Sequence, residues 1–181
     1  MPWAAREAEA AARRLNRAPS PVLARTVPWL VVIAGSVLQT LPLIASAPVM
    51  PPVGFLFLLA WRQLRPGVLP VWSGLPLGLF DDLYSGQPLG SAMLLWSVAM
   101  IVLEVIEQRF PWRSYLVDWF VAAGVIAGYL VLASTIASAG LGQTVTVLAP
   151  QLVLSVLLFP LAERFVALCD RLRLWRFRMA G

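Results

Sequence analysis

Long apolar runs, separated by short segments, constrain the fold of this chain most. Six such runs lie near residues 26–46, 48–61, 68–83, 89–106, 115–138 and 144–168. About 20 apolar residues cross the hydrocarbon of a bilayer, so the longer runs reach across it, whereas the second and third are short. With 60% hydrophobic and 13% charged residues, the chain has more apolar surface than a soluble core of this size can bury. We predict an all-α integral membrane protein.

The positions of the arginines predict how the runs cross the membrane. All 14 basic residues are Arg. If the six runs are spans and the N-terminus is cytoplasmic, the cytoplasmic segments hold 5, 2, 2 and 5 Arg, which is the whole set. The outer loops, near 46–49, 83–89 and 139–143, hold none. Because basic residues accumulate in cytoplasmic loops, we predict one polytopic bundle of six transmembrane helices with both ends in the cytoplasm.

This topology divides the chain into three parts. We predict a cytoplasmic N-terminal helix and linker over residues 1–25, a six-helix transmembrane domain over 26–168 and a basic cytoplasmic tail over 169–181. The net charge of +5 is then typical of attraction to anionic lipid headgroups, and nucleic acid is not an expected partner. Glu104, Glu107 and Asp118 flank a loop with Arg109 and Arg113, so local ion pairs are expected there. Glu104 is the deepest of these acids, and the alternative for it is a role facing the bundle or a partner.

The composition argues against catalysis and metal binding. The chain has no His, and its single cysteine is Cys169. His is the commonest general base and the commonest transition-metal ligand near neutral pH. The sequence also contains no phosphate-binding glycine loop, no nucleophile elbow and no cluster of metal ligands. We therefore predict a protein that is not an enzyme and that has no catalytic residues, no metal and no cofactor.

One stretch, GLPLGLFDDLYSGQPLG at residues 74–90, is the most specific part of the sequence. Its two acids, Asp81 and Asp82, have no basic residue within fifteen positions on either side. Neighbouring helical residues point about 100° apart, so this pair does not converge on one bond. At the C-terminal end of a helix a carboxylate meets the unfavourable end of the helix dipole. Three alternatives remain: solvated acids that open a turn at 82–88, an anchor for the loop at 85–90, and a catalytic or ion-binding site.

The glycines of this stretch predict close packing. Gly74 and Gly78 are spaced by four, a pattern that lets two helices approach closely in membranes. Gly86, Pro88 and Gly90 follow and constrain the backbone. The second helix of such a contact can belong to the same chain or to a partner.

The stretch also resembles a known family. GLFDDLYSGQPLG at 78–90 is similar to the G-L-x-x-D-x-x-S/G-G-x-x-L-G stretch of the bacterial rod shape-determining membrane protein MreD family, with Asp82 at the acidic position and Asp81 as an extra acid. A weaker similarity lies at 58–66, LLAWRQLRP, which resembles the family's apolar helix ending in an aromatic residue, then basic residues and Pro. The candidate partner-binding or structural residues are therefore Trp61, Pro66, Gly74, Gly78, Asp82, Ser85, Gly86, Pro88 and Gly90.

The resemblance implies a non-enzymatic scaffold subunit in the bacterial inner membrane. Such a subunit works with an MreC-like protein and links a cytoplasmic MreB-like filament to RodA and its penicillin-binding transpeptidase. The family is also similar in its six-helix arrangement to substrate-binding subunits of energy-coupling-factor transporters. The alternative function is therefore a vitamin-type small-molecule binding subunit, with few polar candidates beyond Asp81, Asp82, Tyr84, Ser85 and Gln87.

Overall fold

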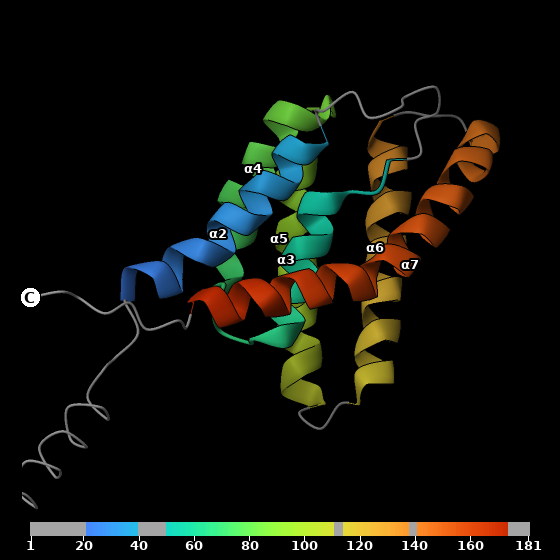
Figure 1. Cartoon of the computed structure of the whole chain (residues 1–181). Helices are drawn as coiled ribbons and strands as arrows, with labels where there is room; N and C mark the ends of the chain where they lie inside the picture. Colours follow the sequence, from blue (N-terminus) through green and yellow to red (C-terminus); the bar gives the residue numbers. More distant parts are fainter. Residues whose placement is uncertain (1–20, 40–49, 111–113, 138–140, 174–181) are drawn as a thin grey trace, which may run out of the picture.

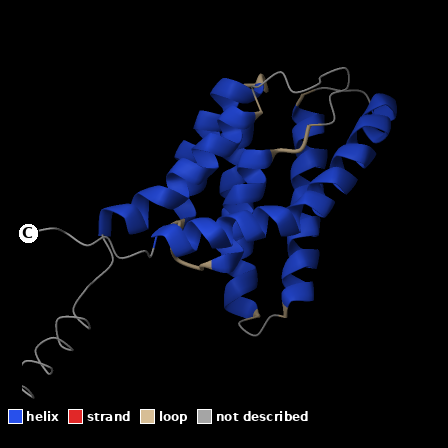
Figure 2. Ribbon diagram, in the orientation of Figure 1, coloured by secondary structure: helices blue, strands red, loops and turns tan. Residues whose placement is uncertain are grey.

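The protein is a bundle of α-helices joined by short connections (Figures 1 and 2). The computed structural model describes residues 21–39, 50–110, 114–137 and 141–173. Its elements are α2 (Pro21–Leu38), α3 (Val53–Leu64), the short 3-10 helix η1 (Val71–Ser73), α4 (Gly74–Ser85), α5 (Ser91–Arg109), α6 (Tyr115–Ile136) and α7 (Leu141–Arg173). No strand occurs among these residues, so the predicted all-α class is confirmed for them.

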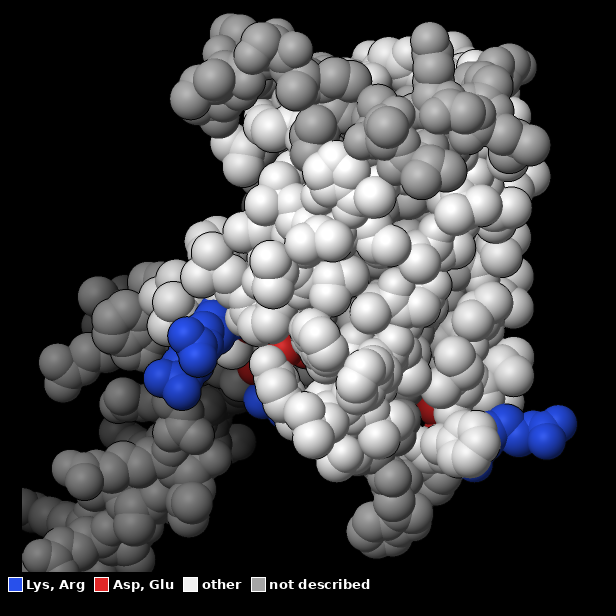
Figure 3. Space-filling model, turned by 90° about the vertical axis from the view of Figure 1, so that its right-hand side faces the viewer, with Lys and Arg blue, Asp and Glu red and all other residues white. Residues whose placement is uncertain are grey.

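Successive helices run in alternating directions between two ends of the bundle (Figure 1). The C-terminal ends of α2, α4 and α6 lie toward the same end as the N-terminal ends of α3, α5 and α7, and we call it the Asp82 end. The Arg62 end lies opposite and holds the connections from α3 to η1 and from α5 to α6. The charged side chains visible in Figure 3 lie in its lower part, toward the Arg62 end, and the described residues above them on this face are drawn as uncharged.

Within the part of the chain that the structure describes, three helices are long and apolar enough to cross a membrane. They are α5, α6 and the part of α7 from Leu148 to Leu172. Two apolar stretches are shorter, Leu23–Leu38 in α2 and Val53–Leu64 in α3. Large apolar side chains also cover the outer surface of the long helices; Phe120, for example, is 65% exposed and Leu157 is 67% exposed. This surface suits contact with lipid.

The observed helices follow the predicted runs, with differences at their ends. α6 spans Tyr115–Ile136 where 115–138 was expected, and α5 spans Ser91–Arg109 where 89–106 was expected. α2 begins earlier than predicted, at Pro21, because proline needs no hydrogen-bond acceptor in the first turn of a helix. α7 continues to Arg173, into the predicted tail. The predicted helix near the N-terminus and the rest of the tail lie outside the described residues.

α3 is short but lies in the centre of the bundle. Its side chains Phe55, Leu58, Leu59 and Trp61 are fully buried. Phe55 stacks on Tyr129 of α6 with ring centroids 4.3 Å apart. A helix of 12 residues rises about 18 Å, less than the thickness of a bilayer core. Neighbouring helices shield it from lipid, and such shielding is what a short segment at membrane depth requires.

Candidate functional site

Asp82 joins the C-terminal end of α4 to the N-terminal end of α5. Its Oδ1 accepts hydrogen bonds from the backbone N–H of Ala92 at 2.8 Å and from the hydroxyl of Ser91 at 3.2 Å. Its Oδ2 accepts from the backbone N–H of Gly90 at 2.9 Å and of Met93 at 3.1 Å. The first N–H groups of a helix have no partner within the helix, so Asp82 supplies the acceptors that the start of α5 lacks.

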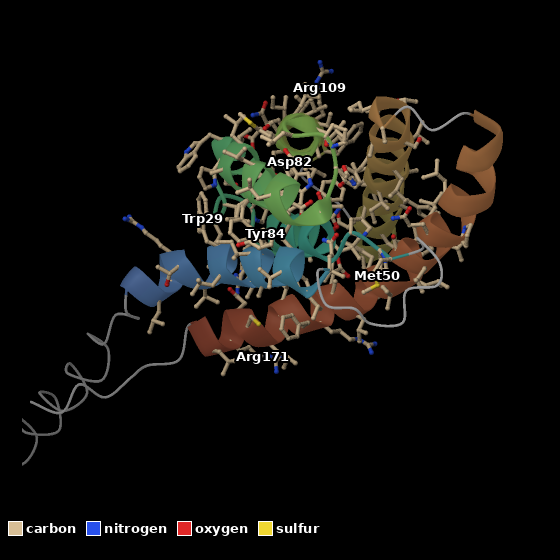
Figure 4. All side chains as sticks on the ribbon, turned by 90° about the horizontal axis from the view of Figure 1, so that it is seen from above. Trp29, Met50, Asp82, Tyr84, Arg109 and Arg171 are labelled. Carbon is tan, nitrogen blue, oxygen red and sulfur yellow. The ribbon has the colours of Figure 1, made fainter. Side chains whose placement is uncertain are left out.

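The hydrogen bonds to α5 offset the unfavourable helix-dipole interaction predicted for Asp82 at the end of α4. The charge sits near the negative end of α4, but it also lies at the positive end of the α5 dipole, where a carboxylate is stabilised. Asp82 is only 4% exposed, which limits screening of that interaction by water. Figure 4 views the molecule from this end and labels Asp82 where α4 and α5 adjoin.

Asp81 points to a different neighbour. It is 2% exposed and lies beside Ser36 of α2. Its Oδ1 has no hydrogen-bond partner among the described residues. Because adjacent helical residues diverge by about 100°, one acid faces α5 and the other faces α2. The two carboxylates are therefore buried and divergent, and the alternative of two solvated acids is wrong.

Gly74 and Gly78 lie where the backbones of α4 and α5 touch. A Cβ added at Gly78 would lie 2.6 Å from the carbonyl oxygen of Ala92 and 2.7 Å from the Cα of Met93. A Cβ added at Gly74 would lie 2.9 Å from the Cα of Ser97. These are main-chain atoms, so they cannot move aside as a side chain would. The close approach predicted from the glycine spacing therefore occurs within the chain.

The turn between the two helices uses glycine for its backbone conformation. Gly86 ends α4 with φ +69°, and Gly90 precedes α5 with φ +95°. An added Cβ at either position would meet no described atom within 4 Å, so conformation rather than space requires glycine here. Pro88 is exposed, and its carbonyl accepts the N–H of Ser91 at 3.0 Å. We call residues 74–93 the α4–α5 hairpin.

Two of the candidate residues lie away from this hairpin. Trp61 is fully buried in α3, and Pro66 is exposed in the connection that follows α3. Both belong to the part of the chain that turns at the Arg62 end (Figure 1). The similarity at 58–66 therefore marks a second region and adds nothing to the geometry around Asp82.

Arg62 forms a buried ionic contact that was not predicted. It is 2% exposed, and its guanidinium pairs with Glu104 and, at 2.7 Å, with Glu107, both on α5. It also donates to the carbonyl oxygen of Leu69 at 3.2 Å. These contacts join residues 42 and 45 positions apart in the chain. The expected local pairs with Arg109 and Arg113 stay a prediction, because Arg113 lies outside the described residues.

The end of α3 is tied to two further helices. Arg65 pairs through its Nε with Asp170 of α7 at 3.0 Å. The side-chain amide of Gln63 donates to the backbone carbonyl of Asp118 in α6 at 3.1 Å. The sequence held part of a signal for this region: Glu104 and Glu107 are three apart and so share a face of α5. Acids on an apolar helix call for a partner, but their spacing does not identify Arg62.

A second close crossing, between α2 and α3, was also not predicted. A Cβ added at Gly35 would lie 2.9 Å from the Cα of Gly54. A Cβ added at Gly54 would lie 3.0 Å from the backbone N of Ser36 and 3.2 Å from the ring of Trp96. Each helix contributes a single glycine, so no spacing within one helix indicates the contact.

The geometry offers structural contacts and little chemistry. Within the described ranges no three His, Cys, Asp or Glu side chains are grouped to hold a metal ion. Both oxygens of Asp82 already accept hydrogen bonds, and Asp81 faces away from it. What the hairpin does is fix two helices against each other through buried polar contacts and main-chain packing.

Comparison with known proteins gives one match. The family described as rod shape-determining protein MreD matches residues 22–169, a range that includes the α4–α5 hairpin and the Arg62 contacts. No curated protein matches the chain, and no solved structure matches it.

Proposed function

Since this chain belongs to the rod shape-determining protein MreD family, we propose that it is a non-enzymatic membrane scaffold of the machinery that elongates rod-shaped bacteria. Membership in the family gives the protein a role in determining rod shape. The proposed partners are an MreC-like protein, a cytoplasmic MreB-like filament, RodA with its penicillin-binding transpeptidase, and the lipids of the inner membrane. The scaffold would hold these partners in one complex at the site of peptidoglycan synthesis.

The arrangement of the helices supports a multi-pass topology with both ends in the cytoplasm. The described helices alternate in direction (Figure 1), and the charged side chains seen in Figure 3 lie toward the Arg62 end. Basic residues favour the cytoplasmic side, so we place the Arg62 end in the cytoplasm and the Asp82 end outside. α3 and α4 are too short to cross alone, and the helices around them would provide their surroundings within the bilayer.

The observation that carries the scaffold proposal is the family match, and the buried hairpin is consistent with it. A general base needs an oxygen free to accept a proton from a substrate, whereas the Asp82 oxygens accept four hydrogen bonds from its own chain. The carboxylate therefore stabilises the packing of α4 against α5. A scaffold subunit that presents a fixed surface to its partners needs helices that are held in place in this way.

Depletion and complementation in a rod-shaped bacterium test this function. We expect rounded cells when the native family member is depleted and rods again when this chain is expressed. The same chain, affinity-tagged and extracted in mild detergent, should retain an MreC-like protein, and mass spectrometry of the retained proteins checks this. Normal cell shape after complete depletion would contradict the proposal, and so would retention of no shape-determining partner.

A further inference from the structure

A cavity of about 310 Å³ opens at the Asp82 end of the bundle. Ligand pockets in proteins occupy about 300–1,000 Å³, so its size fits a small molecule. Its polar lining comes from the end of α2, from α4 and the turn that follows it, and from α6 and α7, through the side chains Gln39, Tyr84, Ser85, Gln87, Tyr129 and Gln151. Tyr84 and Met50, which both line the cavity, are labelled in Figure 4.

Several polar groups of the lining lack a partner. The Nε2 of Gln39 and the Oγ of Ser85 are shielded from solvent and have no hydrogen-bond partner among the described residues. Buried polar groups in native proteins almost always have one. The side-chain N–H of Gln151 donates a hydrogen bond to the carbonyl oxygen of Met50 at 2.8 Å. The amide oxygen of Gln151 can therefore accept a hydrogen bond from a ligand in the cavity. An occupant that accepts from Gln39 and exchanges hydrogen bonds with Ser85 would complete this lining.

The surroundings of the cavity carry no charge that would select an ion. The residues that line it, and their described neighbours at 50–52, 83–90 and 148–152, carry no charged side chain. Asp82 is occupied by the start of α5, and Asp81 is 2% exposed and does not line the cavity. An anion would find no cation here, and a cation would find no accessible carboxylate.

We propose that this cavity binds a small uncharged ligand that carries hydroxyl or amide groups, of the size and chemistry of a monosaccharide. Side-chain amides and hydroxyls both donate and accept hydrogen bonds, as the hydroxyl groups of a sugar do. The rings of Tyr84 and Tyr129, together with Met50 and Leu130, provide apolar surface for the C–H faces of a ring. This site goes beyond the scaffold function and requires no transport step.

Four hexose derivatives of one ring size separate this proposal from its alternatives. The full chain in detergent is titrated at pH 6 with glucose and N-acetylglucosamine, which are neutral, with glucosamine, a cation, and with glucuronate, an anion. A ligand bound only by the folded state raises the unfolding temperature. We expect one or both neutral sugars to raise it by about 5 °C at a hundredfold excess over Kd, and the charged pair to have no effect.

Variants place the binding in this cavity. Gln39→Leu and Gln151→Leu each remove one hydrogen-bonding amide and should weaken the affinity for the better neutral sugar by about three- to tenfold, measured by calorimetry. Gln108→Leu is the matched control, because Gln108 is exposed at the opposite end of α5 and should bind the sugar like the wild type. No stabilisation by either neutral sugar would mean a cavity filled only with water and would overturn the proposal. Equal binding of the charged derivatives would also overturn it, and so would unchanged affinity in both cavity variants.

Discussion

Two pairs of glycines in this protein have the same spacing and opposite surroundings. Gly74 and Gly78 on α4 press against α5, where an added Cβ would lie 2.6–2.9 Å from main-chain atoms. Gly124 and Gly128 on α6 face open space, and an added Cβ there would meet no described atom within 4 Å. A spacing of four permits close approach in membranes, but only one of the two pairs is used for it within the chain.

The difference between the two pairs lies in what holds the facing helix. α4 and α5 are fastened at their joined ends by Asp82 and by the turn through Gly86 and Gly90. α6 instead faces α5 across an apolar groove of about 390 Å³ whose lining includes Gly124 and Gly128. Glycine spacing thus permits a close crossing, and specific polar contacts at the helix ends decide which crossing forms.

Gly78→Leu tests the comparison with the largest expected effect. The new side chain would have to displace the backbone of α5 at Ala92, so we expect the free energy of unfolding to fall by about 3 kcal/mol or more. The thermal unfolding midpoint of the detergent-purified protein measures this. Gly128→Leu is the matched control and should leave the midpoint within a few degrees of the wild type. Equal losses in the two variants would show that the two glycine pairs do not differ.

Asp82→Asn tests the fastening itself and should have the next largest effect. The substitution removes the charge at the start of α5 and turns one acceptor oxygen into a donor that faces backbone N–H groups. We expect a loss of about 2 kcal/mol in the free energy of unfolding and faster hydrogen exchange at the amides of Ala92 and Met93. Asp81→Asn should cost less, because Oδ1 of Asp81 has no hydrogen-bond partner among the described residues. An equal or larger loss for Asp81→Asn would contradict the role assigned to Asp82.

Gly86→Ala separates backbone conformation from space. A positive φ costs a residue with a Cβ about 1–2 kcal/mol, so the unfolding midpoint should fall moderately. Because the position is open, Gly86→Leu should cost about as much as Gly86→Ala. Gly86→Asn should cost less, since Asn tolerates this conformation. A much larger effect for Leu than for Ala would show that the turn is crowded.

Gly124→Ala is expected to have the smallest effect, with the opposite sign. The position lies inside α6 with room for a methyl group, and alanine favours a helix interior over glycine by up to about 1 kcal/mol. The unfolding midpoint should stay unchanged or rise slightly, and circular dichroism during heating measures it. A clear decrease in the unfolding midpoint would contradict this. It would mean that the added methyl group meets another helix of the protein, packed into the groove between α5 and α6 in solution.

The sequence predicted the helices better than their contacts. Apolar runs and turn residues depend on local order along the chain, so the bounds of α5 and α6 were close to those observed. The stretch at 74–90 stood out because two acids beside glycines are unusual at the end of an apolar run. Its geometry, however, depended on α5 returning against α4, and the helix dipole argument considered only the helix that carries Asp82.

Contacts between distant parts of the chain could not be predicted in the same way. Arg62 pairs with Glu104 and Glu107, which lie more than forty residues away. The arginine nearest to these glutamates in the sequence is Arg109, at the end of α5 itself. Helical periodicity tells which residues share a face, but it does not tell which helix that face meets. For the same reason the polar cavity has no signature in any single stretch, because its lining comes from α4, α6, α7 and residues beside α2 and α3.

The bond between Asp82 and α5 also sets an order for membrane insertion. A charged Asp inside the bilayer costs up to about 2.5–3.5 kcal/mol on insertion. All four groups that bind its carboxylate belong to residues 90–93, which the ribosome makes after α4 is complete. In the proposed multi-pass topology α4 gains this compensation only when α5 follows, so we expect the two helices to enter the bilayer as a pair. The carboxylate that fixes the folded shape would then also set the timing of its assembly.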